Sequence, residues 1–93
     1  MYPLISVIVN CHNGAKYLKT CIKSILSQKY KNLEIIFFDN CSTDNSKELI
    51  NQFKDSRIKY HFSKKKLPLY KARNRAIKKS SGPLIAFLDV DDW

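Results

Sequence analysis

Residues 33–44 read LEIIFFDNCSTD, and this stretch sets a pattern that the rest of the chain repeats. Its first six residues, 33–38, form an apolar run that is typical of a strand buried on both faces. The next six are polar and end in Ser42-Thr43-Asp44, three good helix N-caps. We therefore expect a strand, a polar turn and then a helix that buries Leu49 and Ile50.

The same alternation extends in both directions along the chain. Upstream, an apolar run at 4–9 predicts a strand, and a 3.6-residue apolar period at 15–28 predicts an amphipathic helix. Downstream, 58–62 alternates like a strand near a sheet edge, 69–80 has the pattern of a helix, and 84–88 is a further buried strand. Strands that alternate with helices predict an α/β fold with a parallel sheet and right-handed crossovers.

Composition limits the kind of protein this can be. The 93 residues are 44% hydrophobic and 27% charged, which is typical of a folded chain with one core and at most one domain. No apolar run approaches the ~20 residues that cross a bilayer, and the start of the chain does not resemble a secretory signal. Three cysteines without a C-x-x-C pair make no disulfide framework, so we expect a reduced, cytoplasmic protein.

The charge is distributed unevenly along the chain. Residues 56–88 contain ten Lys and Arg and no acidic residue, whereas residues 89–93 contain three Asp and no base. A basic stretch suits either the phosphates of a nucleic acid or an anionic membrane surface. The stretch lacks an aromatic stacking platform and a recognition-helix motif, so we expect no nucleic-acid partner. A basic nucleic-acid-binding α/β module remains the alternative function, and peripheral membrane contact remains open.

Parallel α/β sheets bind ligands outside the carboxyl ends of their strands. Polar residues follow three of the predicted strands at that edge: 10–13, 39–40 and 89–92. The carboxylates of Asp89, Asp91 and Asp92 would repel one another, and a divalent cation would offset that repulsion. The alternative is a solvated acidic turn that caps a following helix.

Other kinds of site are disfavoured by what the sequence lacks. With only two glycines, the chain has no G-x-G-x-x-G fingerprint and no Walker loop, so a phosphate-bearing ligand would need a metal or Arg and Lys. Cys11, His12 and Cys41 could converge on zinc if the first two strands are neighbours. The absence of a closely spaced cysteine pair disfavours that site.

Four segments stand out together: SVIVNCHNG at 6–14, LEIIFFDNCSTD at 33–44, ARNRAI at 72–77 and GPLIAFLDVDD at 82–92. In this order and spacing they resemble the family 2 glycosyltransferases, and the likeness covers essentially the whole chain. The resemblance implies a partial GT-A domain: residues 1–93 would be the nucleotide-sugar-binding half, a fragment without the acceptor half. The expected fold is a Rossmann-like parallel sheet in the order β-α-β-α-β-α-β, with strand order 3-2-1-4 and three α/β/α layers.

The resemblance also implies an activity. A sugar would be transferred from a nucleotide-diphospho-sugar, of UDP or dTDP type, to a hydroxyl of a glycan or lipid-linked acceptor, with Mn²⁺ or Mg²⁺ as cofactor. The setting would be cell-surface polysaccharide biosynthesis, in the cytoplasm, with or without contact to the membrane. The catalytic base would lie beyond Trp93, so no catalytic residue is assigned here and the 93 residues alone are expected to be inactive.

Site residues follow from the resemblance position by position. The D-x-D motif falls on Asp89, near the ribose, and on Asp91, which would hold the metal at the diphosphate. The other residues implied to bind the nucleotide are Asn10, His12, Asn13, Asp39, Asn40, Arg73 and Asn74. Two of them depart from the family: His12 replaces an aromatic residue that packs on the base. Asn40 replaces an aspartate, and because an amide both donates and accepts hydrogen bonds, the base preference stays open.

Overall fold

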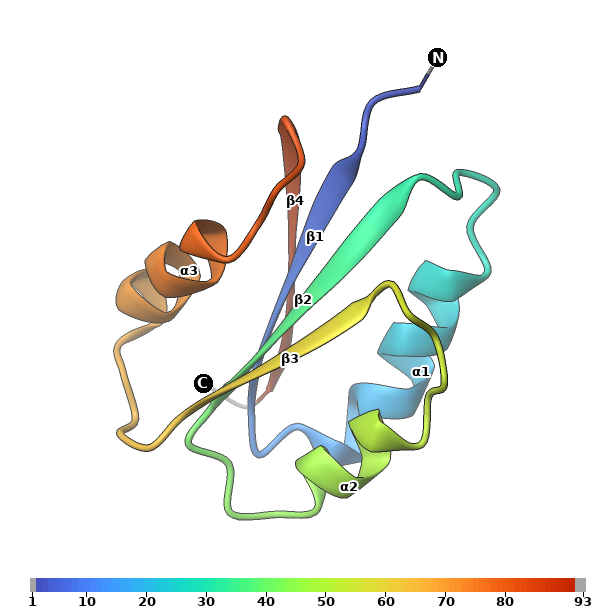
Figure 1. The fold of residues 1–93 in the computed structure, drawn as a ribbon. Coiled ribbons are helices and arrows are strands. Elements are labelled where there is room, and N and C mark those ends of the chain that lie inside the picture. Colours follow the sequence, from blue (N-terminus) through green and yellow to red (C-terminus); the bar gives the residue numbers. More distant parts are fainter. Residues whose placement is uncertain (1, 92–93) are drawn as a thin grey trace.

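A computed structural model describes the backbone of residues 2–91 and the side chains of residues 2–90. Four strands and three helices alternate along these residues (Figure 1). They are β1 (Ile5–His12), α1 (Ala15–Leu26), β2 (Leu33–Asn40), α2 (Ser46–Asn51), β3 (Ile58–Ser63), α3 (Leu69–Lys78) and β4 (Leu84–Asp91). The strands are parallel and lie in the order β3-β2-β1-β4, which confirms the predicted α/β fold and the strand order 3-2-1-4.

Helices cover both faces of the sheet. α1 and α2 pack together on one face, and α3 packs mainly over β1 and β2 on the other (Figure 1). Because side chains alternate along a strand, β2 contributes to both cores: Phe37 faces α1 and α2, while Phe38 faces α3. α3 approaches the sheet closely because it packs through two small residues, Ala72 and Ala76, which are fully buried. The result is the expected three-layer α/β/α arrangement.

The strands β1, β2 and β4 are longer than their apolar runs predict. Each continues into the polar motif that follows, so Asn10, Asp39 and Asp89 are strand residues rather than loop residues. Hydrogen bonding between strands does not depend on side-chain polarity, and the register pairs Asn10 with both Phe38 and Asp89. Consecutive polar residues in these motifs therefore point to opposite faces of the sheet.

β4 differs from the prediction of a buried strand. Leu84, Ile85, Phe87 and Leu88 are 39–50% exposed, and Val90 is the buried member among its described side chains. β4 is an edge of the sheet formed by residues 2–91, so the described elements leave much of its surface uncovered. An apolar composition indicates that a strand is suited to burial, but it does not identify the element that buries it.

Candidate functional site

Asn13 ties together the two loops at the carboxyl edge of the sheet, the lower edge in Figure 1. It has a φ of 53°, in the left-handed region that asparagine tolerates better than most residues. Its Oδ1 accepts hydrogen bonds from the backbone N of Thr43 at 2.7 Å and of Asp44 at 3.3 Å, while its own backbone N donates to Ser42 Oγ at 2.9 Å. The side-chain oxygen of Asn13 is therefore engaged in joining the β1–α1 loop to the β2–α2 loop.

Asp44 fixes the starts of two helices at the same edge. Its Oδ2 accepts a hydrogen bond from Ala15 N at 3.0 Å, and its Oδ1 accepts one from Ser46 N at 3.0 Å. Burial opposes ionisation of Asp44, but these hydrogen bonds and one from the Ser46 hydroxyl outweigh it and lower the pKa of its carboxyl. Next to Ala15, Gly14 passes so close to β4 that a Cβ there would lie 2.2 Å from the carbonyl oxygen of Val90. The edge is thus built from tightly packed, well-bonded loops.

Asp39 has both carboxylate oxygens bonded inside the protein. It is 1% exposed and lies on the face of β2 that α1 and α2 cover. Its Oδ1 accepts a hydrogen bond from Ser42 N at 3.0 Å, and its Oδ2 accepts one from the Tyr60 hydroxyl at 2.6 Å. Burial and the neighbouring Asp39 raise the pKa of Tyr60. Sequence reasoning missed Tyr60, although the alternation of β3 places it on the same face as Asp39.

Asn40 points to the opposite face and is fully buried. Its Oδ1 accepts a hydrogen bond from Leu67 N and its Nδ2 donates one to Leu67 O, both at 2.8 Å. The backbone oxygen of Asn40 also accepts a hydrogen bond from Nδ1 of His12 at 2.7 Å, because a carbonyl can only accept. The amide of Asn40 thus holds the loop between β3 and α3 against the sheet, and its carbonyl orients the ring of His12.

Asn10 presents the opposite situation. Its side chain is fully buried, yet neither its Oδ1 nor its Nδ2 has a hydrogen-bond partner among the described residues. Asp89 is its register partner on β4, and the Oδ2 of Asp89 accepts a hydrogen bond from Arg73 Nη2 at 2.6 Å. Arg73 also covers the ring of Phe87 at 5.5 Å, and its buried Nε has no partner in the described part of the chain. Asn10, Arg73 and Asp89 thus bring unbonded polar atoms and a partly exposed ion pair to one face of the sheet.

The remaining predicted positions are less fully placed. Asn74 follows Arg73 in α3 and is exposed. Asp91 ends β4, where its backbone pairs with His12, but its side chain lies outside the described residues, as does Asp92. Among the side chains of residues 2–90, no group of three or more His, Cys, Asp and Glu is close enough to hold a metal ion. The prediction that Asp91 holds the metal therefore stays a prediction.

The disfavoured zinc set is not brought together within this part of the chain. The thiol of Cys11 donates to Ser46 Oγ at 3.6 Å, whereas the thiol of Cys41 donates to Lys64 O at 3.1 Å. Burial raises the pKa of Cys11, which favours the protonated thiol over the thiolate that zinc requires.

A second polar cluster at the amino-terminal end of the strands was missed by sequence reasoning. Glu34 is 3% exposed and accepts hydrogen bonds from Ser6 Oγ at 2.5 Å, Ser81 N at 2.6 Å and Lys59 Nζ at 2.8 Å. Ser6 Oγ in turn accepts one from Gly82 N at 2.9 Å. The cluster joins β1, β2, β3 and the α3–β4 connection. Its signal in the sequence is a single acidic residue inside an otherwise apolar strand.

None of the helices in the described residues is long and apolar enough to cross a membrane. The sequence profile of the family described as glycosyl transferase family 2 matches residues 6–93. The chain is 43% identical over 93 residues to WfaP of Escherichia coli, named UDP-Glc:alpha-D-GlcNAc-diphosphoundecaprenol beta-1,3-glucosyltransferase, covering 97% of this chain and 36% of WfaP. It spans about a third of the length of WfaP and of three other curated relatives that it matches.

Two solved structures share the fold. The crystal structure of Staphylococcus aureus TarS 1-349 in complex with UDP-GlcNAc is similar with a TM-score of 0.85 and 27% identity, over 96% of this chain and 27% of that chain. The mannosyltransferase PcManGT from Pyrobaculum calidifontis, in complex with GDP-Man and Mn²⁺, gives a TM-score of 0.90 over 97% of this chain and 28% of that chain. Its sequence identity is 22%, so this likeness supports the fold alone.

Proposed function

This chain belongs to glycosyltransferase family 2, and on that premise we propose that it forms the donor-binding part of an enzyme that transfers a sugar from a nucleotide-diphospho-sugar. The observation that carries the proposal is the buried amide of Asn10, unbonded within the described residues and next to the Arg73–Asp89 pair. A buried polar group without a partner costs about 1–3 kcal/mol, and a ligand that bonds to it recovers that free energy. The amide lies at the edge where parallel sheets bind ligands.

The base of the nucleotide is assigned to the amide of Asn10 and the ring of His12. An amide offers one acceptor and two donor hydrogens, which suits the mixed edge of a pyrimidine in a UDP or dTDP donor. UDP-GlcNAc is bound in the TarS complex, whereas PcManGT holds GDP-Man. Asn13, Asp39 and Asn40 then act by shaping the pocket, because their side-chain oxygens already bond to the protein.

The diphosphate and its cation are assigned to Arg73, Asn74, Asp89 and Asp91. The site is suited to Mn²⁺ or Mg²⁺, because Asp89 is a hard oxygen ligand and only its Oδ2 bonds to a described residue. Asp91 would hold the ion, with Asp89 near the ribose. When bound, the ion would neutralise negative charge that develops on the departing diphosphate. Arg73 would hold Asp89 in place and add positive charge beside the phosphates.

In the proposed reaction a hydroxyl of the acceptor attacks the anomeric carbon while the bond from that carbon to the diphosphate oxygen breaks. A general base takes the hydroxyl proton, and we place that base beyond Trp93, so the 93 residues alone would transfer no sugar. The name of WfaP specifies a GlcNAc-diphosphoundecaprenol acceptor. By similarity we propose a glycan or lipid-linked acceptor, met at the cytoplasmic surface of a membrane.

The test is an NMR titration of the ¹⁵N-labelled chain with UDP, dTDP and UDP-glucose, each with Mg²⁺, up to about 10 mM so that weak binding is detected. We expect shifts at residues 10–14, 73–74 and 89–91, and none at Glu34 or Ser81 at the other end of the sheet. Asp91→Asn should remove the dependence on Mg²⁺. Asp55→Asn is the matched control, because Asp55 pairs with Arg57 away from this edge. Shifts confined to another region, or no shift at all, would contradict the proposal.

A further inference from the structure

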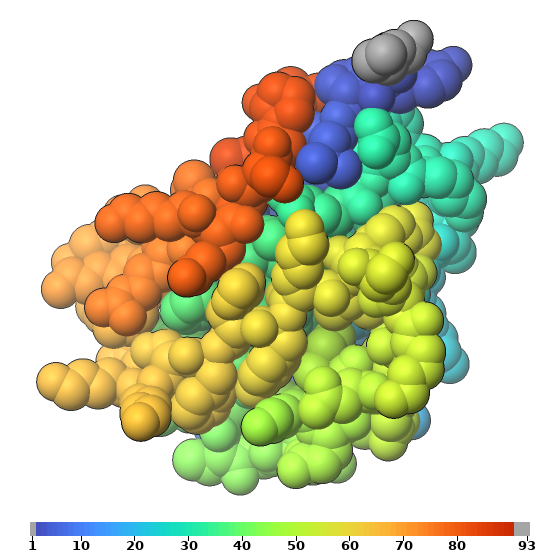
Figure 2. Space-filling model, in the orientation of Figure 1, coloured from blue at the N-terminus to red at the C-terminus, as the bar shows by residue number. Residues whose placement is uncertain are grey.

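A cleft lies between β3 and α3, on the opposite side of α3 from the Arg73–Asp89 pair. Because α3 packs mainly over β1 and β2, the same face of the edge strand β3 stays open beside the helix. The cleft has a volume of about 390 Å³, and Figure 2 views it between the yellow atoms of β3 and the orange atoms of α3. Its lining residues are Phe38, His61, Phe62, Arg75, Lys78 and Lys79.

The charge of this cleft is positive and uncompensated. Half of the lining residues are Arg or Lys and none is acidic. Arg75, Lys78 and Lys79 form no ion pair with any described residue, whereas three other cations of the same basic stretch are each paired with a carboxylate. An anion that entered the cleft would therefore meet cations that pair with no carboxylate in the described part of the chain.

Part of this charge has a structural explanation. Arg75 and Lys78 lie in the last turn of α3, where cations interact favourably with the negative end of the helix. That explanation does not extend to His61, which comes from β3 and is half-buried in the cleft. Burial, Lys79 and Lys59 lower the pKa of His61, and Glu34, which lies on the same face, is bonded to Lys59. Cations from two elements thus act on one imidazole.

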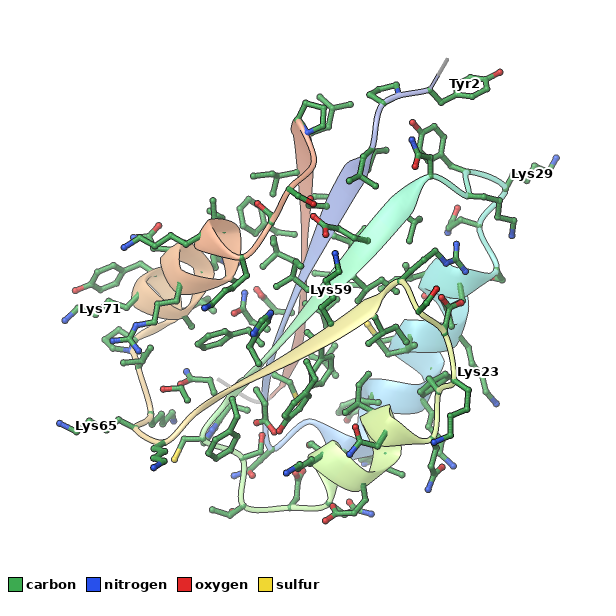
Figure 3. The ribbon with its side chains drawn as sticks, viewed as in Figure 1. Tyr2, Lys23, Lys29, Lys59, Lys65 and Lys71 are labelled. Carbon is green, nitrogen blue, oxygen red and sulfur yellow. The ribbon has the colours of Figure 1, made fainter. Side chains whose placement is uncertain are left out.

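The cleft is separate from the nucleotide site proposed above. Arg73 and Arg75 are two residues apart, so they project about 160° apart around α3, from nearly opposite sides of the helix. Arg73 bonds Asp89 on β4, whereas Arg75 lines the cleft beside β3. In Figure 3, Lys65 and Lys71 point into solvent, while Lys59 reaches across the sheet toward Glu34. The cations of the basic stretch therefore differ in their surroundings, and only some of them line a cavity.

We propose that the cleft between β3 and α3 binds the phosphate group of an anionic ligand, with Arg75 and Lys78 supplying charge and His61 a further hydrogen bond. The ring of Phe38 in the lining favours a phosphate joined to an apolar or ring-bearing group. The phosphate of a small ester and that of an anionic lipid headgroup share this chemistry. The inference stands apart from the donor proposal, because no lining residue belongs to the carboxyl-edge site.

The first test titrates the ¹⁵N-labelled chain with inorganic phosphate. We expect saturable shifts at His61 and Arg75, together with a rise in the pKa of His61, because a bound dianion favours the imidazolium. Arg75→Gln combined with Lys78→Gln should weaken phosphate binding about tenfold or more. Lys64→Gln combined with Lys65→Gln removes equal charge from an exposed loop and should change it less than about twofold. All four substituted residues are exposed, so both double variants should fold.

The second test distinguishes the two sources of phosphate. Vesicles of phosphatidylglycerol and phosphatidylcholine are compared with phosphatidylcholine alone in co-sedimentation. If the ligand is a lipid headgroup, the chain should bind the anionic vesicles. Inorganic phosphate should compete with that binding, and the variant with Arg75→Gln and Lys78→Gln should lose it. A small ester predicts phosphate binding without vesicle binding. The proposal is overturned by the absence of saturable phosphate binding, by equal losses in the two double variants, or by binding to duplex DNA alone.

Discussion

The two ends of the sheet both bury polar side chains, but they satisfy them differently. At the amino-terminal end, Glu34 bonds to the side chains of Ser6, Lys59 and Ser81. At the carboxyl end, the amide of Asn10 is equally inaccessible and has no hydrogen bond within the described residues. Each hydrogen bond that a buried polar group forms within the protein contributes about 0.5–1.5 kcal/mol, whereas a buried polar group without a bond is costly unless a ligand completes it. The contrast separates polar residues that hold the fold together from those available to a ligand.

The largest effect is expected at the bonded end, from Glu34→Gln. Burial opposes ionisation of Glu34, but hydrogen bonds from Lys59, Ser6 and Ser81 outweigh it and lower its pKa from 4.5 to about 2. Because the folded pKa is the lower one, this stabilisation is complete above pH 4.5 and is lost as the pH falls toward 2. We expect the variant to lose about 3 kcal/mol at neutral pH and less in acid, measured by urea unfolding.

The control for this experiment is Glu48→Gln, an exposed residue in the first turn of α2. It should cost about 0.5 kcal/mol, since it loses only a weak interaction with the helix dipole. A stability gap between wild type and the Glu34 variant that stays constant from neutral pH to acid would show that the ionised cluster does not stabilise the fold.

Asn40→Leu should give the next largest loss, about 2 kcal/mol. The substitution is close in volume, but it leaves the backbone N and O of the half-buried Leu67 without the two bonds that the amide of Asn40 supplies. The loop between β3 and α3 should also exchange its amide hydrogens faster, because the two hydrogen bonds from Asn40 no longer hold it against the sheet. Unfolding and hydrogen exchange measure the two effects. A variant as stable as wild type would show that the two hydrogen bonds between Asn40 and Leu67 contribute nothing to stability.

Asn10→Leu should raise the free energy of unfolding, whereas Asn40→Leu should lower it. The same substitution, at an equally buried asparagine, removes an amide that bonds to no described residue, so we expect a gain of about 1 kcal/mol. The NMR shifts caused by UDP should at the same time weaken or vanish. A loss of stability would mean that Asn10 is bonded in the folded protein, and unchanged binding of UDP would remove Asn10 from the donor site.

Local pattern predicted the elements well and the surroundings of their polar residues poorly. The apolar run of 33–38 and the helical period of 15–28 were sufficient for β2 and α1, because each depends on neighbours in the sequence. The bond from Asn40 to Leu67 spans 27 residues and leaves no periodic trace. Nothing local distinguishes Asn40 from Asn10, although one is bonded and the other is not. The exposure of β4 is a similar case, since it depends on which elements lie beside it.

The smallest effect on stability is expected for Asp89→Asn, and it tests the comparison most sharply. The Arg73–Asp89 pair is partly exposed, with side chains 39% and 28% accessible, so solvent screens it and its loss should cost about 1 kcal/mol or less. Asp55→Asn breaks the pair with Arg57, whose side chains are 27% and 26% accessible, and should cost a similar amount. If the carboxyl edge is a ligand site, only the Asp89 variant should weaken binding of UDP with Mg²⁺, by about tenfold, in the NMR titration. A carboxylate that binds the donor must affect the affinity for UDP more than it affects the stability of the fold. If the Asp89 and Asp55 variants bind UDP equally well, Asp89 therefore belongs with the residues that hold the fold together.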